Sequence, residues 1–487
     1  MNQNANQSQL LINGERCNAR KGATFTRSNP IDGVLSTICA SASTDDATAA
    51  VDAAAAAFPA WAATGPALRR ELLMKGVAAL LGRREEFITV MAQETGASRI
   101  FAERNVLGAA STLTEAAALT SQIGGDVLPT NVPGNLSLGL RRPAGVVLGI
   151  APWNAPVNLG VRAIATPLAC GNTVVLKGSE KCPRTHELIA LAMHEAGLPA
   201  GVVNFITHAP ADAGRIVEVM VAHPAVRRVN FTGSTHVGRL IAQTCAAYLK
   251  PCVLELGGKA PFVVLDDADI DAAVAAASFG AFANSGQICM STERLIVDEA
   301  VADEFVAKLV ARAKTLTVGD PREGSYVLGS VALNDTMTRC NALIDDAIGA
   351  GARIVCGGKT DSALMTPTLL DHVTTGMRIF QDETFAPVKG ILRVRGVEQA
   401  VAAANHGEFG LSAAVFGGDL ARAWEVAGRI ESGMCHINGP TVHDEPQMPF
   451  GGLKDSGYGR FGGKAAVEAF TELRWVSVQM ASRTYPF

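Results

Sequence analysis

Three polar residues have sequence surroundings that suit acyl-transfer chemistry. Cys289 lies among glycine and small polar residues in FANSGQICMSTER, where the backbone N–H groups of a Gly-Gln turn favour the thiolate that attacks a carbonyl carbon. Glu255 lies between apolar residues in VLELGGK, so burial is expected to raise its pKa toward that of a general base. Asn154 lies on the proline-bracketed turn APWNAP, where its side-chain N–H₂ group can hold an oxyanion.

Each of these residues also has an ordinary structural interpretation. For any one of the 10 cysteines, a small packed side chain is the commoner use. An acid at a strand end can be a buried structural glutamate bonded to backbone, and an asparagine near prolines is a common turn former. Taken singly, Cys289, Glu255 and Asn154 therefore leave both interpretations open.

Two further segments suit a dinucleotide. RVNFTGSTHVG predicts a strand that leads into a helix capped at Thr232 or Ser234, whose free N–H groups can face a phosphate. In TVVLKGSE, Lys177 and Glu180 follow a strand, at the edge where an open α/β sheet binds its ligand. A carboxylate there accepts hydrogen bonds from ribose hydroxyls and repels a 2′-phosphate, which favours NAD⁺ over NADP⁺. A plain capped turn and a solvated Lys–Glu pair are the alternatives.

These residues must be positioned by an alternation of short β-branched runs with Ala-rich stretches of helical spacing. The alternation predicts an α/β fold with a mostly parallel sheet, and its recurrence from Leu295 to Phe416 predicts a second α/β unit. Two segments, 137–142 and 474–479, predict strands outside this pattern, which pair either with another subunit or within one chain. The expected helices are 45–61, 68–95, 186–196 and 270–283, and the expected strands are 145–151, 173–177, 202–206, 228–232 and 260–265.

Composition excludes several classes of protein. The formal net charge of the 487 residues is -4, so no basic face is predicted and nucleic acid is not an expected partner. The first residues are polar and uncharged, unlike a signal peptide, and no stretch approaches the ~20 apolar residues that span a bilayer. The cysteines form no CxxC pair and no zinc-site spacing, so no metal is expected and the thiols are expected to be reduced. These features predict a cytoplasmic enzyme without a membrane partner.

Seven motifs occur together and in a particular order: PWN, KGSE, FTGSTxVG, LELGGK, GQxC, ETFAP and PFGGxKxSGxGR. The series resembles that of the aldehyde dehydrogenase superfamily, from about Leu11 to the C-terminus. The resemblance implies an α/β protomer with a Rossmann-type NAD-binding domain (1–123 and 144–255), an α/β catalytic domain (256–465) and a small β oligomerisation arm (124–143 and 466–487). It also implies a homodimer or homotetramer.

The resemblance implies a role for each motif residue. Cys289 matches the nucleophile, Glu255 the general base, and Asn154 the oxyanion donor beside the Cys289 backbone N–H. Departures from the commonest pattern, which remove no catalytic group, occur at Gly178, Ser291 and Phe461. The implied cofactor-binding residues are Ile150, Trp153, Lys177, Glu180, Phe231, Gly233, Ser234, Val237, Leu256, Glu383 and Phe385.

Within the superfamily, the sequence is most similar to the bacterial salicylaldehyde and vanillin dehydrogenases, through GQICMSTERL, CHINGPTVHDE, PFGGLKDSGYGRFGG and the ending YPF. This implies NAD-dependent oxidation of an aromatic aldehyde to the acid, through a thiohemiacetal and a thioester on Cys289 that is hydrolysed with Glu255 as base. Phe101 and Phe450 are expected to sandwich the ring. Arg162 is expected to meet a phenolic oxygen or a carboxylate, or to pair with a protein acid. The expected pocket residues are Phe101, Ala155, Arg162, Ile288, Met290 and Phe450.

Three other functions remain open at this stage. A semialdehyde dehydrogenase would use Arg162 to bind a substrate carboxylate. A CoA-acylating relative generally lacks a glutamate at the position of Glu255, so the presence of that residue argues against it. A non-catalytic NAD-binding or structural relative belongs to a different class, and the presence of Cys289, Glu255 and Asn154 counts against it.

Overall fold

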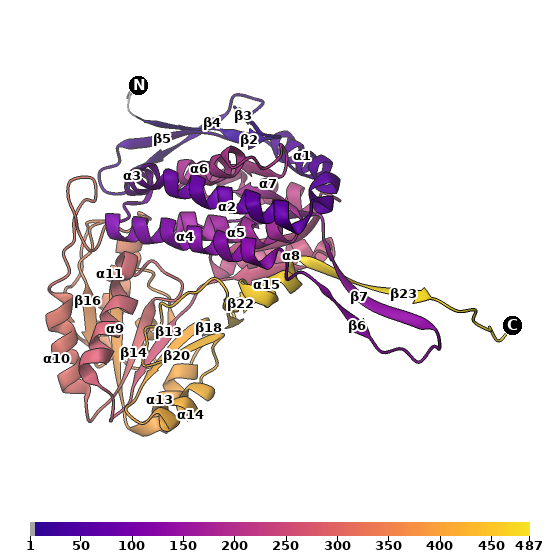
Figure 1. The fold of residues 1–487 in the computed structure, drawn as a ribbon. Coiled ribbons are helices and arrows are strands. Elements are labelled where there is room, and N and C mark those ends of the chain that lie inside the picture. Colours follow the sequence, from indigo (N-terminus) through magenta and orange to yellow (C-terminus); the bar gives the residue numbers. More distant parts are fainter. Residues whose placement is uncertain (1–4) are drawn as a thin grey trace.

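Two α/β sheets form the body of the protein, in a computed structural model that describes residues 5–487 (Figure 1). The first sheet has 8 strands in the order β22-β12-β11-β8-β9-β10-β2-β3. Its five central strands, from β12 to β10, are parallel. The strand bounds are β2 Leu10–Ile12, β3 Glu15–Cys17, β8 Val146–Ile150, β9 Thr173–Lys177, β10 Val203–Ile206, β11 Val226–Thr232, β12 Cys252–Glu255 and β22 Gly457–Tyr458.

Helices cover both faces of this sheet, which is why its central strands read as nearly unbroken apolar runs. Every residue of β8 and β9 is buried. One face packs against α1, α7 and α8, and the other against α2 to α6. Ser43 and Asp46 form a capping box that begins α1. The helix bounds are α1 Thr44–Ala63, α2 Pro66–Gly82, α3 Arg84–Thr95, α4 Arg99–Leu119, α5 Pro156–Ala169, α6 Pro183–Glu195, α7 Ala213–Ala222 and α8 Thr235–Ala247.

The second sheet has 7 strands in the order β15-β16-β17-β14-β13-β19-β20, all parallel except β15. Its strands are β13 Ala260–Val264, β14 Thr292–Asp298, β15 Arg353–Cys356, β16 Thr368–Asp371, β17 Val388–Val394, β19 Ser412–Phe416 and β20 Met434–Ile437. Its helices are α9 Ile270–Phe282, α10 Ala302–Ala313, α11 Thr336–Gly349, α12 Arg378–Gln381, α13 Gly396–Asn405 and α14 Leu420–Gly428. This confirms the expected second α/β unit.

Two small sheets complete the body. One is the 3-stranded sheet β1 (Asn6–Ser8), β5 (Leu35–Ala40) and β4 (Thr24–Ser28), which lies along the N-terminal edge of the first unit. The other is the pair β18 (Phe409–Gly410) and β21 (Leu453–Lys454). Helix α15 (Gly463–Ala469) follows β22 and leads into the last strand of the chain.

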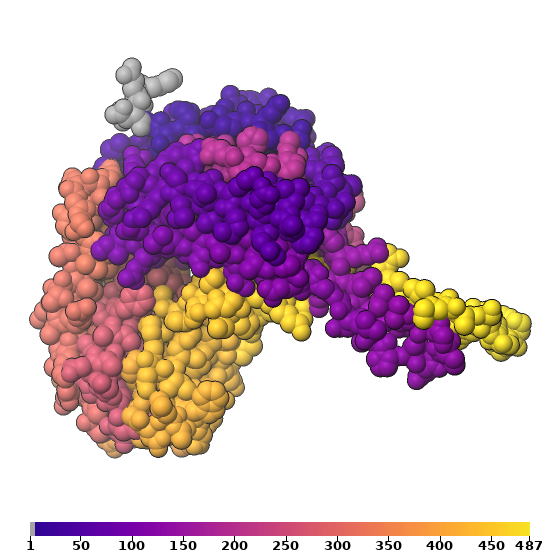
Figure 2. Space-filling model, viewed as in Figure 1, coloured from indigo at the N-terminus to yellow at the C-terminus, as the bar shows by residue number. Residues whose placement is uncertain are grey.

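A three-stranded arm projects from the body (Figures 1 and 2). It is built from β6 (Gly125–Leu128), β7 (Asn135–Pro143) and β23 (Thr471–Gln479), and β7 pairs with β23 along its whole length. The two strands expected outside the alternation therefore pair with each other within one chain. Apolar side chains on the arm stay exposed, with Val127 73% and Trp475 76% accessible.

The sequence pattern misplaced one boundary. The single helix expected over 68–95 is two helices, α2 and α3, because Gly82 ends the first and Arg83 leaves helical geometry at φ -98°, ψ 11°. Arg83 is thus both the C-cap residue of α2 and the N-cap residue of α3. None of the helices within residues 5–487 combines the length and apolar composition needed to cross a lipid bilayer.

Candidate active site

The expected cofactor residues gather at the carboxyl edge of the first sheet. In register, Ile150 of β8 pairs with Lys177 of β9 on one side and with Phe231 of β11 on the other. Glu255, at the end of β12, pairs with Thr232. The chain order runs from β8 toward β9 and β10, and then resumes on the opposite side at β11 and β12. The crevice at such a reversal is where open α/β sheets bind ligands.

The turn after β11 forms a helix N-terminus that faces this crevice. Ser234 caps α8 by accepting a hydrogen bond from the Val237 N–H, as the sequence predicted. The Gly233 N–H donates to the Glu255 carbonyl at 3.0 Å, which joins the turn to the end of β12. A Cβ at Gly233 would lie 2.4 Å from the Phe231 ring, so only glycine fits. Leu256 packs against Gly238 in the first turns of α8.

Lys177 and Glu180 lie beside each other at the end of β9. Lys177 is only 7% exposed, and none of the hydrogen bonds or ion pairs among residues 5–487 involves its ammonium group. Burial lowers the pKa of Lys177, and the Glu180 charge opposes that effect. Burial raises the pKa of Glu180, but the Lys177 charge and a backbone N–H outweigh it, so the net pKa lies below its ordinary value. A buried cation without a protein partner, next to an ionised acid, fits a ligand with several hydroxyl groups.

The opposite wall of the crevice comes from the segment after α12. The Glu383 carboxylate accepts a hydrogen bond from the Gly258 N–H at 3.0 Å. Burial raises the pKa of Glu383 to about 7. Phe385 has φ +46° and meets Trp153 edge-to-face, with ring centroids 5.6 Å apart. This places Trp153, Glu383 and Phe385 together, although they come from distant parts of the sequence.

The loop before Cys289 has a strained backbone that the surrounding structure holds in place. Asn284, Ser285 and Gly286 have φ values of +50°, +55° and +74°, the left-handed region that non-glycine residues rarely adopt. The Ser285 hydroxyl donates to the Gly329 carbonyl at 2.9 Å, and the Gln287 amide donates to the Ser330 carbonyl at 3.1 Å. Strained backbone of this kind is found where the structure fixes the orientation of a functional side chain. Here the strained residues lie three to five positions before Cys289.

Asn154 is fixed directly against this loop. Its side-chain amide donates a hydrogen bond to the backbone carbonyl of Gln287 at 3.0 Å. Its backbone carbonyl accepts a hydrogen bond from the Asn284 side chain at 2.9 Å. The Asn154 amide has a second N–H, and the contact with Gln287 lies two residues before Cys289. The spatial meeting of Asn154 with the nucleophile segment, expected from the resemblance, is present.

Glu255 faces the same thiol from the other side. A Cβ at Gly258 would lie 2.4 Å from the Cys289 carbonyl oxygen, so the Gly257-Gly258 pair lets the two segments approach. Glu255 is 1% exposed, and neither of its oxygens accepts a hydrogen bond among the described residues. Burial raises its pKa to about 7, with the Cys289 thiol and the Arg162 charge acting in the opposite direction. The raised pKa that the sequence predicted for Glu255 is confirmed.

The expectation for Cys289 was wrong in one respect. The thiol pKa is raised well above its ordinary value, by burial and by the nearby Glu255 charge, with only Arg162 opposing them. Desolvation and the like charge of Glu255 thus disfavour the thiolate that the Gly-Gln turn was expected to favour. The thiol is therefore protonated at neutral pH, and the adjacent Glu255 is the group placed to accept its proton.

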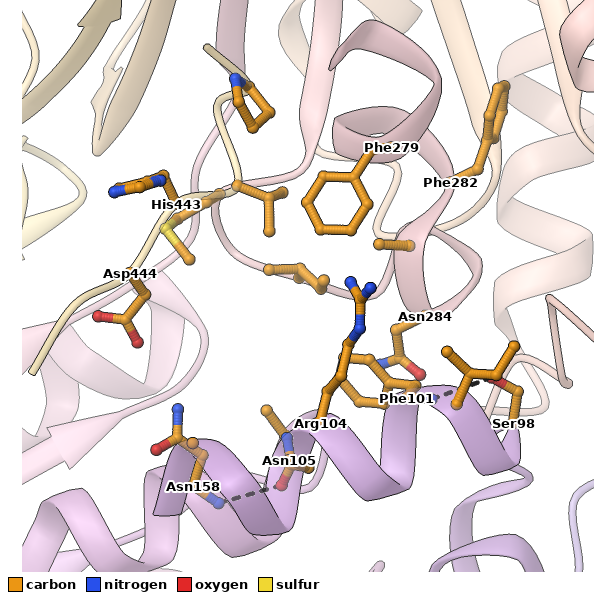
Figure 3. A pocket seen from close by; sticks show the side chains of 18 of the residues that line it. Ser98, Phe101, Arg104, Asn105, Asn158, Phe279, Phe282, Asn284, His443 and Asp444 are labelled. Carbon is orange, nitrogen blue, oxygen red and sulfur yellow. Dashed lines mark hydrogen bonds between the residues drawn. The ribbon is translucent and has the colours of Figure 1, made fainter. Parts of the chain in front are cut away.

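A cavity of about 680 Å³ lies beside the Cys289 segment, although Cys289 itself does not line it (Figure 3). Its lining includes Ile288 and Met290, the two neighbours of Cys289, and also Phe101 and Ala155, as expected. The residues that the sequence analysis missed include Arg104, Asn158, Phe279, Phe282, Arg312 and Asp444. They come from α4, α5, α9, α10 and the loop after β20, and no local motif marked them.

Two expected pocket residues do not line this cavity. Arg162 is 7% exposed and forms an ion pair with Asp444, which decides between the alternatives left open for it. Phe450 is buried beneath Arg162, with the guanidinium 4.4 Å from the ring centroid. The prediction that Phe101 and Phe450 sandwich a ring was therefore wrong, because Arg162 occupies the face of Phe450. Asp444, the partner in the ion pair, does line the cavity.

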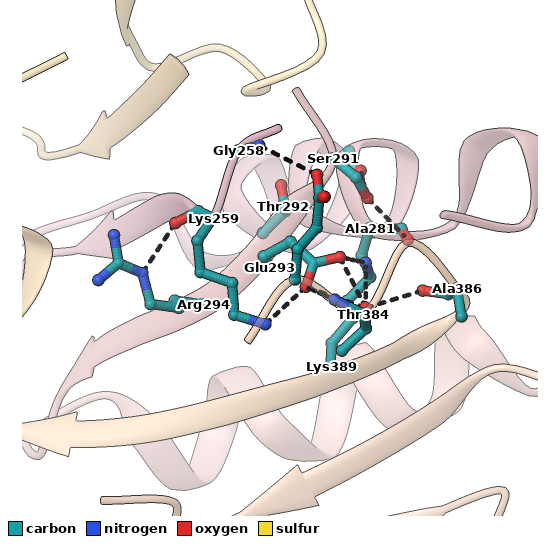
Figure 4. Close-up of polar contacts among 12 residues, drawn as sticks. Gly258, Lys259, Ala281, Ser291, Thr292, Glu293, Arg294, Thr384, Ala386 and Lys389 are labelled. Atoms are coloured by element: carbon teal, nitrogen blue, oxygen red, sulfur yellow. Dashed lines mark hydrogen bonds and ion pairs between the residues drawn. The ribbon is translucent and has the colours of Figure 1, made fainter. Parts of the chain in front are cut away.

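A buried ion network supports the Glu383 segment (Figure 4). Glu293 of β14 lies 2.6 Å from both Lys259 and Lys389, and it accepts a hydrogen bond from the Thr384 N–H at 2.9 Å. Burial raises the pKa of Glu293, but the two lysines overcome this and bring it to about 2. Thr384 immediately precedes Phe385 and follows Glu383, so the network fixes the backbone between them. The sequence analysis did not identify this network.

Two further features of the chain concern disulfide bonds and metal sites. All 10 cysteines are free thiols. Within the part of the chain that the structure describes, no group of three or more His, Cys, Asp or Glu side chains is arranged to hold a metal ion.

Comparison with known proteins connects this geometry to a family. The pattern of the group described as "Aldehyde dehydrogenase family" matches residues 18–476. A vanillin dehydrogenase of Pseudomonas fluorescens is 58% identical over 98% of this chain and 99% of its own. A salicylaldehyde dehydrogenase of Pseudomonas sp. (strain C18) is 48% identical over 99% of this chain and 100% of its own. The crystal structure of a salicylaldehyde dehydrogenase from Pseudomonas putida G7, complexed with salicylaldehyde, has a TM-score of 0.97 at 47% identity and covers 99% of this chain and 100% of that one.

Proposed function

The chain belongs to the aldehyde dehydrogenase family, and from that membership we propose that it oxidises aromatic aldehydes to carboxylic acids with NAD⁺ as the hydride acceptor. The observation that carries the proposal is the meeting of Cys289, Glu255 and Asn154 next to a cavity that the two neighbours of Cys289 line. A thiol, a base of elevated pKa and an amide donor are the groups that acyl chemistry at a carbonyl needs.

Cys289 is the proposed nucleophile. Its proton passes to Glu255 as its sulfur forms a bond to the aldehyde carbon. The oxygen of the resulting thiohemiacetal is held by the Asn154 N–H and the backbone N–H of Cys289. The thiol needs this adjacent base because its pKa is raised above the ordinary value.

The cofactor supplies, when bound, the acceptor for the hydride that leaves the carbon as the thiohemiacetal becomes a thioester. Glu255, its first proton lost to solvent, then deprotonates a water whose oxygen attacks the thioester carbon. The carbon–sulfur bond breaks, the acid leaves, and Cys289 takes up a proton again.

Several groups of this chain fit a nicotinamide dinucleotide. The unpartnered Lys177 and the ionised Glu180 suit the hydroxyls of an adenosine ribose, and the N-terminus of α8 at Ser234 suits the pyrophosphate. Glu383 and Phe385 on the opposite wall suit the nicotinamide ribose and ring. We propose NAD⁺ rather than NADP⁺ because an ionised Glu180 repels a 2′-phosphate. Ile150, Trp153, Phe231, Gly233, Val237 and Leu256 complete the proposed cleft.

The proposed aromatic substrate rests on two observations. The relatives at 58% and 48% identity act, by name, on vanillin and salicylaldehyde. Phe101, Phe279 and Phe282 line the cavity and give it aromatic walls. A semialdehyde substrate was expected to bind its carboxylate to Arg162. This is not supported, because Arg162 already forms an ion pair with Asp444.

We also propose a division of the chain into an NAD-binding part (1–123 and 144–255), a catalytic part (256–465) and an arm (124–143 and 466–487) that associates with a second copy. The exposed apolar side chains of β6 and β23, including Val127 and Trp475, support a homodimer or homotetramer. Light scattering of the purified protein gives the mass that tests this.

The test of function is NADH formation by the purified protein with benzaldehyde, salicylaldehyde, vanillin, succinic semialdehyde and a short aliphatic aldehyde. Each aldehyde is paired with NAD⁺ and with NADP⁺. The expected result is the highest kcat/KM for the aromatic aldehydes with NAD⁺. No NADH with any aldehyde, from protein that binds NAD⁺, would leave a non-catalytic relative instead.

A further inference from the structure

Two arginines line the substrate cavity without an acidic partner. Arg104 belongs to α4 and Arg312 to α10, and both are solvent-exposed. Among residues 5–487, no ion pair and no side-chain hydrogen bond involves either guanidinium. Most arginines of the chain do have such partners, so two unpaired ones on a single cavity wall are a local concentration of positive charge.

The rest of the lining does not neutralise them. Asp444 is the one acid that lines the cavity, and its carboxylate is held by Arg162. His443, the remaining titratable residue, lies 2.9 Å from Glu445, which does not line the cavity. The wall therefore carries an uncompensated charge of about two units from Arg104 and Arg312 at neutral pH.

The Arg104 side chain projects into the cavity. Figure 3 shows its side chain extending from α4 into the middle of the cavity, between Phe101 on its own helix and Phe279 on α9. Its guanidinium lies 5.7 Å from the centroid of the Phe279 ring. Arg104 and Phe279 thus approach each other across the cavity, a cation beside an aromatic face.

The inner end of the cavity has the opposite character. Ile288 and Met290, which flank Cys289, are apolar, as is Ala155, which directly follows Asn154, and Asn284 is the polar residue of the same loop that lines the cavity. An aldehyde carbonyl at Cys289 thus places its ring among apolar groups. Arg104 and Arg312 line other parts of the same cavity, where a substituent on the far side of that ring would be placed.

We propose that Arg104, assisted by Arg312, selects aromatic aldehydes that carry an anionic substituent, a carboxylate or phenolate, on the side of the ring remote from the aldehyde. The proposal rests on the proposed function and adds to it a second point of recognition, separate from the thiol and from the cofactor. The substituent gains a charge-assisted hydrogen bond to a guanidinium that has no competing protein partner. An anionic substrate is also drawn toward a positively charged entrance.

The expected effect is modest, because both arginines are exposed and water and salt screen their charge. A two- to fivefold preference is the order expected for such a contact, which corresponds to about 0.4–1 kcal/mol. It should weaken as the ionic strength rises, since exposed charges act over about 10 Å at 0.1 M salt.

The test compares 4-formylbenzoate with its methyl ester, which has the same ring and aldehyde but no charge. The measured quantity is the acid-to-ester ratio of kcat/KM in the wild type, Arg104→Gln, Arg104→Lys and Arg312→Gln. Arg353→Gln removes an exposed arginine of β15 outside the cavity and is the matched control. We expect the ratio to fall two- to fivefold in Arg104→Gln and less in Arg312→Gln. It should stay near wild type in Arg104→Lys and Arg353→Gln, and fall in the wild type between 50 and 500 mM salt.

An acid-to-ester ratio that Arg104→Gln leaves unchanged would overturn the proposal, as would an equal loss on both substrates. A larger Arg104-dependent effect on succinic semialdehyde than on 4-formylbenzoate would overturn its aromatic part. These outcomes differ from a failure of the proposed function, in which the wild type oxidises neither the acid nor the ester.

Discussion

The ammonium of Lys259 lies 2.6 Å from the carboxylate of Glu293, and this buried contact joins the segment of the proposed base to the segment of the proposed nucleophile. Lys259 follows Glu255 by four residues, and Glu293 follows Cys289 by four. Both side chains of the pair are about 2% exposed. The relative position of base and thiol therefore depends on an ion pair as well as on backbone packing.

Glu293→Gln should be among the most damaging single substitutions outside the reacting groups. It leaves Lys259 and Lys389 buried without a counter-charge, a change that typically costs about 3–5 kcal/mol of unfolding free energy. It should also lower the pKa of Glu383, since the Glu293 charge helps to raise it. Urea unfolding and the KM for NAD⁺ measure the two effects, with the exposed Glu323→Gln as control. An unfolding midpoint equal to the control would contradict this role.

Cys289→Ala should abolish NADH formation while NAD⁺ binding survives. The thiol forms the covalent bond to substrate, whereas the cofactor groups lie on other elements. Activity and the quenching of protein fluorescence by NAD⁺ give the two readouts, and Cys17→Ala is the control because that thiol lies on β3. Unimpaired turnover in Cys289→Ala would remove the thioester mechanism.

Glu255→Gln should stall the enzyme as a thioester. Rapid mixing should show a burst of NADH of about one equivalent per active site at most, followed by a slow steady state. The burst itself is expected to be slower than in the wild type, because Glu255 also accepts the thiol proton. A normal steady-state rate would exclude Glu255 as the base.

The same substitution should not weaken the fold at pH 8. The Glu255 pKa is raised from 4.5 to about 7, so its contribution to stability is present below pH 4.5 and is lost as the pH rises through about 7. Replacing a charged buried acid by a neutral amide of the same shape removes that loss, on the order of 3 kcal/mol. Thermal melting at pH 5 and pH 8 compares the two proteins. A melting temperature of Glu255→Gln well below that of the wild type at pH 8 would contradict the free-energy cost assigned to the buried Glu255 charge.

Substitutions of Arg162 and of Asp444 should shift the acidic side of the pH–rate profile in opposite directions. The Arg162 charge lowers the pKa of Glu255 and the Asp444 charge raises it. If Glu255 is the base, as proposed, activity falls as the pH drops through about 7. Arg162→Gln should shift that fall to higher pH, and Asp444→Asn to lower pH. Shifts of the same sign in both variants would mean that the substitutions act through general disruption.

Glu180→Gln should increase the use of NADP⁺ relative to NAD⁺. The substitution removes the negative charge that repels a 2′-phosphate and leaves Lys177 to attract it. The NADP⁺-to-NAD⁺ ratio of kcat/KM is expected to rise roughly tenfold, the scale of a loss of about one charge contact. Glu218→Gln, at an exposed position on α7, is the control. A ratio equal to that control would assign cofactor choice to other residues.

The features that neighbouring residues determine were predicted from the sequence. The strand over Thr173–Lys177 and the cap at Ser234 follow from β-branched runs and capping chemistry, and both are present. The elevated pKa of Glu255 followed from its apolar neighbours. In each case the deciding contacts lie within a few residues.

Contacts between distant segments could not be predicted in this way. Arg162 meets Asp444 across 282 residues, and Glu293 meets Lys389 across 96. No periodicity or motif connects such residues, so the blocked face of Phe450 and the support of Glu383 appeared only in three dimensions. The thiol pKa of Cys289 was misjudged for the same reason, because its surroundings come from β12 and α5 as well as from its own loop.

The pairing of β7 with β23 has a consequence for how the molecule is made. Asn135 and Gln479 are 344 residues apart, yet their side chains are hydrogen-bonded at the tip of the arm. Asn172, at the start of β9, likewise donates to the carbonyl of Phe470. During synthesis β7 therefore waits for its second partner until β23 has been made, more than 300 residues later. Folding of the first sheet can begin earlier, and a stop codon before Thr471 would leave β7 as an open sheet edge prone to aggregation.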